Sequence, residues 1–110
     1  MPRTEEEIVI FCTVPNRVEG EKIAKELVEL RLAACVNMVE GVTSYYNWKG
    51  EVHQDPELLL VIKSLQARFP ELESKIRQLH NYEAPEIIAL PIVAGSEDYL
   101  EWLAMEVKSK

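Results

Sequence analysis

Cysteine and long apolar runs are both scarce in this sequence. Only two cysteines, Cys12 and Cys35, occur among the 110 residues, and they are too far apart for a disulfide framework or a CxxC site. We therefore expect reduced thiols and a cytoplasmic location. No apolar run approaches the ~20 residues that span a bilayer. Residues 1–7 are polar and acidic, unlike a signal peptide, so we expect no membrane partner.

Positive charge is also in deficit. Lys and Arg number 12 against 19 Asp and Glu, which gives a formal net charge of -7 at pH 7. Proteins that neutralise nucleic-acid phosphates gather their Lys and Arg on one surface, whereas here the basic residues are scattered along the chain. We therefore expect no nucleic-acid partner, and the acidity indicates a solvated surface.

Motifs of the common enzyme classes are missing as well. The chain has no Gly-rich phosphate loop, no nucleophile elbow and no HExxH zinc motif. Cys12 and His80 form a conceivable nucleophile and base, but a cysteine in a buried strand has no evident oxyanion hole beside it. The sequence therefore predicts a protein that is not an enzyme.

Apolar patterning predicts four strands and three helices. A nearly continuous apolar run at residues 8–14 is typical of a strand buried on both faces. A long strand at 36–48 contains Gly41, where a bulge or a bend is expected, and Lys49-Gly50 should turn the strand into a hairpin. Asp55-Pro56 is expected to break the returning strand before residues 58–62. Pro91 is expected to place the last strand, 87–93, at an edge or at an irregular point of the pairing. Helical spacing covers residues 18–34 and 65–79, and Ser96 can cap a closing helix.

This order of elements predicts the fold class. Two split βαβ units form the ferredoxin-like α+β arrangement, a four-stranded antiparallel sheet with helices on one face. Here it carries a long hairpin and an extra C-terminal helix. In this arrangement strand 8–14 lies between strands 58–62 and 87–93. Right-handed crossovers select this topology over its mirror image. We expect a polar lead-in at residues 1–7 and a single domain over residues 8–110.

The loop HNYEAPE at residues 80–86 concentrates polar side chains between a helix and the last strand. Loops held by rigid elements commonly carry binding groups. The topology brings this loop to the same end of the sheet as the end of the first strand and the tip of the hairpin. We therefore predict that Cys12, His53 and His80 share one rim of the molecule.

The predicted sheet also indicates self-association. Alternate residues of a strand face opposite sides of the sheet, and the helices of one subunit can cover only one side. A large exposed apolar surface usually marks an association site, and the hairpin residues Tyr45, Tyr46 and Trp48 are of the types enriched in interface cores. We predict a homo-oligomer in which the sheets pack together.

Five segments of the chain resemble the CutA family of divalent-cation tolerance proteins. They are FCTVPN (11–16), LAACVN (32–37), TSYYNWKG (43–50), HNYEAPEI (80–87) and DYLEWL (98–103). Their order and spacing make the resemblance specific over nearly the whole chain. It implies a ferredoxin-like fold and a compact homotrimer built on the long hairpins, related in architecture to the P-II signalling proteins.

The resemblance further implies a role in tolerance of divalent metals, copper in particular. Bacterial members are assigned copper ligands at a first-strand cysteine and at two consecutive histidines, which fall here on Cys12, Leu79 and His80. Leu79 cannot ligate a metal, so the implied metal ligands are Cys12 and His80. Further ligands would come from His53, Glu83, Glu86 or a neighbouring subunit. The implied cofactor is copper or another divalent metal ion.

These residues also have structural interpretations. Cys12 fits a small buried hydrophobe in a central strand, and His80 fits a residue that binds the last carbonyls of a helix. Tyr82 and Pro85 are interpreted as structural, with Pro85 steering the chain into the last strand. Glu83 and Glu86 are expected to line a polar cleft.

Two functions therefore stay open. The first is a trimer that binds copper or another divalent ion through Cys12 and His80 and acts in metal tolerance. The second is a P-II-like signalling or scaffold trimer, which binds a small molecule or a partner protein in clefts between subunits.

Overall fold

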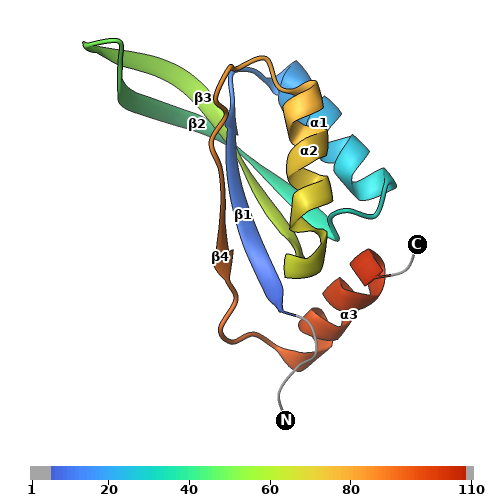
Figure 1. The fold of residues 1–110 in the computed structure, drawn as a ribbon. Helices are drawn as coiled ribbons and strands as arrows, with labels where there is room; N and C mark the ends of the chain where they lie inside the picture. The colour runs from blue at the N-terminus through green and yellow to red at the C-terminus, as the bar shows by residue number, and fades with distance from the viewer. Residues whose placement is uncertain (1–5, 109–110) are drawn as a thin grey trace.

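The protein is a four-stranded sheet with helices packed on one face (Figure 1). The computed structural model describes residues 6–108, so most of the predicted lead-in lies outside the described residues. The elements are β1 (Glu7–Val14), α1 (Arg17–Glu29), β2 (Cys35–Trp48), β3 (Glu51–Leu65), η1 (Gln66–Arg68), α2 (Phe69–Leu79), β4 (Ile87–Pro91) and α3 (Glu97–Lys108).

The strand order is β2-β3-β1-β4, and each neighbouring pair is antiparallel. This arrangement confirms the predicted ferredoxin-like α+β fold with an additional C-terminal helix. β1 lies between β3 and β4 as predicted, and β4, which contains Pro91, is an edge strand. No helix within residues 6–108 has both the length and the apolar character needed to cross a bilayer.

The main core lies between the sheet and helices α1 and α2. Alternate side chains of β1 enter it, because a strand directs every second residue to the same face. The cluster that they join contains Ile8, Ile10, Cys12, Val14, Ile23, Leu27, Leu60, Ile62, Leu72 and Ile76. A smaller cluster forms under α3 from Ala34, Leu65, Leu103 and Val107.

The β2–β3 hairpin extends well beyond the helices (Figure 1). Gly41 has a φ of 82°, and the pairing of β2 with β3 shifts register between Val39 and Val42, which confirms the predicted bulge. Lys49 (φ 53°) and Gly50 (φ 83°) close the hairpin. Positive φ at both central residues is the signature of a type I′ turn, whose twist matches that of the strands.

Helix α1 is shorter than predicted. It ends at Glu29 rather than at residue 34, because Arg31 adopts a left-handed φ of 59°. The amide of Arg31 donates to the Val28 carbonyl (3.0 Å) and that of Leu32 to the Leu27 carbonyl (2.9 Å), which is a Schellman cap. Glycine usually occupies this left-handed position, so an arginine gives little warning of the helix end in the sequence.

The predicted break at Asp55-Pro56 is wrong. β3 runs without interruption from Glu51 to Leu65, and Pro56 pairs with Thr43 of β2. β1 pairs with β3 only as far as Leu58, so Pro56 lies where β3 has a neighbour on one side alone. A proline lacks an amide donor, and such a one-sided position tolerates that loss.

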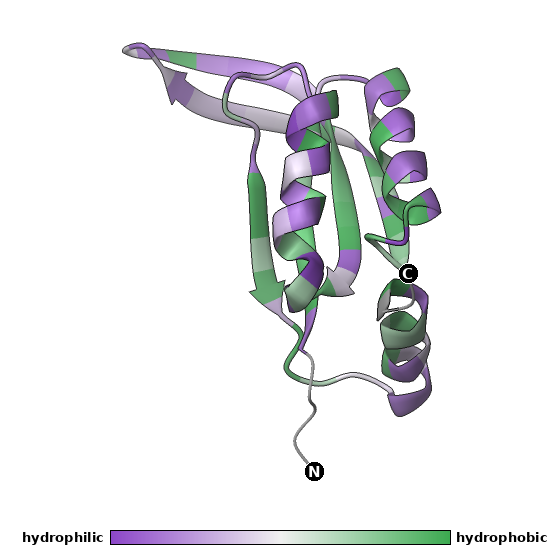
Figure 2. Ribbon diagram, turned by 45° about the vertical axis from the view of Figure 1, so that its right-hand side comes forward, coloured by the Kyte–Doolittle hydropathy of each residue, from purple (hydrophilic) through white to green (hydrophobic). Residues whose placement is uncertain are grey.

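The sheet face opposite α1 and α2 is uncovered within one chain. Cross-strand pairs such as Phe11 with Ile88 and Val9 with Leu90 lie there, and Ile88 and Leu90 are 51% and 46% exposed. Figure 2 shows β4 as a largely hydrophobic strand. We call this surface the open apolar face; it comprises Val9, Phe11, Val39, Leu59, Val61, Ile88 and Leu90.

Candidate functional site

His80 ends α2 with both ring nitrogens engaged. Its side chain is fully buried, Nε2 lies 2.8 Å from the Thr13 carbonyl oxygen, and the Tyr82 amide lies 3.1 Å from Nδ1. A carbonyl can only accept and an amide can only donate, so Nε2 carries the proton and Nδ1 accepts. His80 thus joins the end of α2 to the end of β1.

A buried carboxylate holds the same loop from the other side. Glu19, in the first turn of α1, is only 7% exposed. Its two oxygens accept hydrogen bonds from the backbone amide (3.0 Å) and the side-chain amide (2.8 Å) of Asn81. The same carboxylate lies 3.4 Å from Nδ1 of His80. The loop after α2 is therefore fastened to both α1 and β1.

Cys12 points into the core beside this network. Its side chain is fully buried, and desolvation is the main cause that raises the pKa of Cys12 to about 12. The nearby charges of Glu86, Glu19 and Glu57 add to this effect. Cys12 is therefore a neutral thiol near pH 7, whereas metals bind the thiolate form.

The structure brings two of the three predicted rim residues close together. Cys12 directly precedes Thr13, the partner of His80. His53 instead lies out on the hairpin, where its ring stacks on Tyr46 with centroids 5.5 Å apart. Within residues 6–108, no three His, Cys, Asp or Glu side chains are grouped so that they could hold a metal ion. The copper site at Cys12 and His80 stays a prediction.

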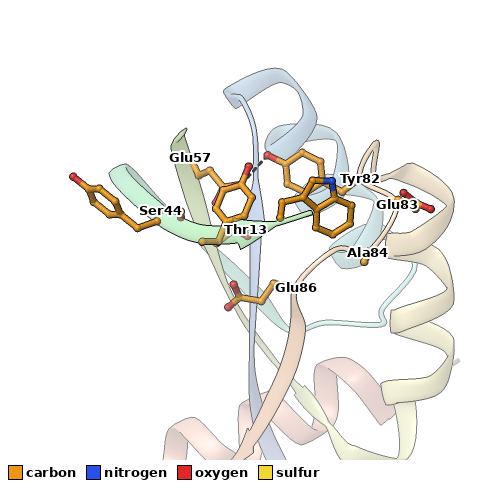
Figure 3. Close-up of a pocket in the computed structure, with 10 residues that line it drawn as sticks. Thr13, Ser44, Glu57, Tyr82, Glu83, Ala84 and Glu86 are labelled. Atoms are coloured by element: carbon orange, nitrogen blue, oxygen red, sulfur yellow. Dashed lines mark hydrogen bonds between the residues drawn. The ribbon is translucent and has the colours of Figure 1, made fainter. Parts of the chain in front are cut away.

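A hollow of about 490 Å³ opens on the other side of the sheet. Figure 3 shows residues of β1, the hairpin and the loop after α2 along its sides. Thr13 lines it, while the neighbouring Cys12 points to the core, so strand alternation divides the predicted rim between two faces. The lining residues are Thr13, Ser44, Tyr45, Tyr46, Trp48, Glu57, Tyr82, Glu83, Ala84 and Glu86.

Glu57 and Tyr82 form the most buried polar contact of this hollow. The Tyr82 hydroxyl donates to a Glu57 carboxylate oxygen at 2.7 Å, and Glu57 is only 7% exposed. Desolvation raises the pKa of Tyr82, and the hydrogen bond to Glu57 raises it further. Farther along the hairpin, the Tyr46 hydroxyl donates to Asp55, and this bond raises the pKa of Tyr46.

Glu83 and Glu86 line the hollow, as the sequence predicted. The roles of Glu57 and Glu19 were not predicted. A signal for Glu57 existed, because it has the same strand parity as Leu59 and Val61 of the open apolar face. A carboxylate among apolar residues on one face of a strand indicates one of two things. Either that end of the strand is exposed to solvent, or the carboxylate is buried and has a functional role. Glu19 gave no signal, since acidic residues are common in the first turn of any helix.

Comparison with known proteins agrees with this architecture. A family model described as CutA1 divalent ion tolerance protein matches residues 8–106. The divalent-cation tolerance protein CutA of Thermus thermophilus is 53% identical over 97 residues, which make up 88% of this chain and 94% of that protein. The chloroplastic protein CutA of Arabidopsis thaliana is 48% identical over 101 residues. Those residues are 92% of this chain but only 56% of the plant protein.

Solved structures show the same fold. The divalent cation tolerance protein of Thermus thermophilus superposes with a TM-score of 0.87 at 52% identity, covering 88% of this chain and 94% of that one. CutA1 of Oryza sativa gives a TM-score of 0.92 at 41% identity and covers 96% of both chains. The family model spans most of the sequence, and the relatives named above are 41–53% identical to this chain. The chain therefore belongs to the CutA1 divalent ion tolerance protein family.

Proposed function

We propose that this protein acts in the tolerance of divalent metal ions, in the cytoplasm and without catalysing a reaction. The observation that carries the proposal is the match of the CutA1 divalent ion tolerance model to residues 8–106. The absence of enzyme motifs from the sequence supports a binding role. Growth of a strain that lacks the gene, with and without added copper, tests the proposal; equal growth of the complemented and deleted strains would contradict it.

The second part of the proposal is that the protein works as a homotrimer. The open apolar face supports this, because Ile88, Leu90 and Val39 are each 44% exposed or more, and a monomer rarely leaves such a row in water. Analytical ultracentrifugation should give three times the 12.6 kDa mass of one chain.

The double variant Ile88→Lys/Leu90→Lys should dissociate, because each lysine places a charge in the interface. Val93→Lys is the matched control: Val93 is 87% exposed and follows β4. A monomeric wild type, or equal dissociation by the control, would argue against assembly through this face.

The third part concerns the metal. We propose copper, with Cys12 and His80 as ligands and with further ligands from another copy of the chain. Binding there requires Cys12 to lose its proton and His80 to give up its bond to Thr13 or to Tyr82. Titration calorimetry with copper on the wild type, Cys12→Ser and His80→Ala tests the site, and Cys35→Ser is the thiol control. Equal affinity in all four proteins would exclude these ligands.

A second function is favoured by the hollow on the open side of the sheet. Its position between the hairpin and the loop after α2 suits a P-II-like role, in which a small molecule or a partner protein binds at a boundary between subunits. A thermal-shift screen of metabolites tests this role, since a ligand of the folded state raises the melting temperature.

A further inference from the structure

The hollow has an unusual chemical character. Its lining includes three carboxylates, those of Glu57, Glu83 and Glu86, and no Lys, Arg or His. Four aromatic side chains supply most of the remaining wall: Tyr45, Tyr46, Trp48 and Tyr82. Such a surface repels phosphates and carboxylates, and it suits a positively charged group on an apolar body.

The buried carboxylate of Glu57 is the centre of this negatively charged lining. Oε2 of its carboxylate accepts the Tyr82 hydroxyl, while Oε1 has no hydrogen-bonding partner within residues 6–108. No Lys, Arg or His among those residues forms an ion pair with Glu57 either. More than nine-tenths of the residue is buried, but Oε1 is not among the buried side-chain atoms that lack a partner in residues 6–108, so it is open to the hollow. A carboxylate that has lost most of its water is costly unless an opposite charge or enough hydrogen bonds compensate. A ligand cation in the hollow supplies that compensation.

The aromatic rings supply the second element of recognition. In the single chain, Tyr46, Trp48 and Tyr82 are 42%, 43% and 37% exposed, so each residue can present part of its ring to the hollow. A cation within about 6 Å of an aromatic centroid is attracted by the ring quadrupole. The ammonium of the neighbouring Lys49 lies 6.0 Å from the Trp48 centroid, at the outer limit of such an interaction.

We propose that the hollow binds a small organic cation, a protonated or quaternary amine on a compact apolar body. The ammonium lies at Glu57, and the body lies against Trp48 and Tyr82. A volume of about 490 Å³ is within the range of small-molecule sites, which favours a free amine over the side chain of a partner protein. This inference rests on the second proposed function and names the class of its ligand.

Three aromatic probes of nearly equal size test the charge requirement on the full chain in its native assembly. Benzylamine is cationic at neutral pH, benzyl alcohol is neutral, and benzoate is anionic. Calorimetry should detect binding of benzylamine, with benzyl alcohol about tenfold weaker or more and benzoate not bound. The expected factor is that of a charge-assisted hydrogen bond. Trp48 fluorescence, measured in a Trp102→Phe background, should respond to benzylamine.

Two isosteric variants test whether the cation binds at the Glu57 carboxylate. Glu57→Gln keeps an acceptor for the Tyr82 hydroxyl but removes the charge, and it should weaken benzylamine binding about tenfold. Glu101→Gln changes the net charge equally on the exposed surface of α3 and should leave binding unchanged. Equal weakening by both variants would overturn the proposal, because the attraction would then come from overall charge.

The remaining outcomes are also decisive. Binding of benzyl alcohol as tight as that of benzylamine overturns the cation assignment. Benzoate binding without benzylamine binding overturns it too, but leaves a small-molecule role intact. Binding of a lysine-bearing hexapeptide without benzylamine binding replaces the free amine by a protein partner. If none of the probes binds, the cation assignment is wrong, and the metabolite screen alone then decides the second function.

Discussion

Cys12 should stay a neutral thiol far above the pH at which an ordinary cysteine ionises. Desolvation in the core, with smaller contributions from Glu86, Glu19 and Glu57, raises the pKa of Cys12 from 9.0 to about 12. This difference corresponds to about 4 kcal/mol of free energy between the two protonation states. The burial of a single thiol therefore couples protein stability to alkaline pH.

The direction of the coupling follows from proton binding. Below about pH 9 both the folded and the unfolded chain hold the thiol proton, and the stabilising contribution is fully present. Between about pH 9 and about pH 12 the unfolded chain loses this proton while the folded chain keeps it. The unfolded state then binds fewer protons, so the free energy of unfolding falls as pH rises, and the contribution is lost by about pH 12.

Guanidinium unfolding of the wild type and Cys12→Ala, at one protein concentration and a series of pH values, measures this contribution. From neutral pH to about pH 11, the wild type should lose about 3 kcal/mol more than the variant does. Tyr46, Tyr82 and Tyr99 also have raised pKa values, but they titrate in both proteins and cancel in the difference. Gln78→Ala, at an exposed position of α2, is the control and should follow the wild type. Parallel profiles for the wild type and Cys12→Ala would refute the reasoning.

Three further predictions concern the loop and the hairpin. His80→Ala should lower the free energy of unfolding by about 2–4 kcal/mol, because two buried hydrogen bonds lose a partner. Denaturant unfolding measures this loss, with the exposed Gln78→Ala as the control. Equal effects of the two variants would contradict the prediction. Tyr82→Phe should cost about 1–2 kcal/mol, and a double-mutant cycle with Glu57→Gln should show coupling between the two residues, whereas strict additivity would mean that their bond contributes nothing. Gly50→Ala should cost about 1 kcal/mol from its positive φ, seen as a lower midpoint in the same assay; an unchanged midpoint would show that the turn relaxes.

Local patterns predicted most of the fold. Continuous apolar runs marked the strands, and Gly41 and Lys49-Gly50 marked the bulge and the turn, because each of these signals depends on neighbours along the chain. The predictions of the end of α1 and of a break at Pro56 were wrong because an uncommon residue type occupies each of these positions. Arg31 takes the left-handed position usually given to glycine, and Pro56 sits inside a strand that lacks a second neighbour at that point.

The directions of the side chains in the loop at residues 80–86 could not be predicted from the sequence. The sequence showed that polar residues gather in this loop, but it did not show which of their side chains face the core and which face the hollow. His80 and Asn81 bind Thr13 and Glu19, whereas Tyr82, Glu83 and Glu86 line the hollow. Whether a polar side chain faces the core or the hollow depends on contacts between distant segments.

The sequence by itself therefore determined the order of elements, the family and the acidic, aromatic make-up of the hairpin and loop. Only the tertiary structure decided that Cys12 and Thr13, adjacent in the chain, serve opposite faces of the sheet. It also decided that His80 has both nitrogens engaged and that Glu57 lies buried beside an aromatic hollow. The physical reason is that burial, pairing and proton affinity are set by the surroundings of a side chain, which folding assembles from segments far apart in the sequence.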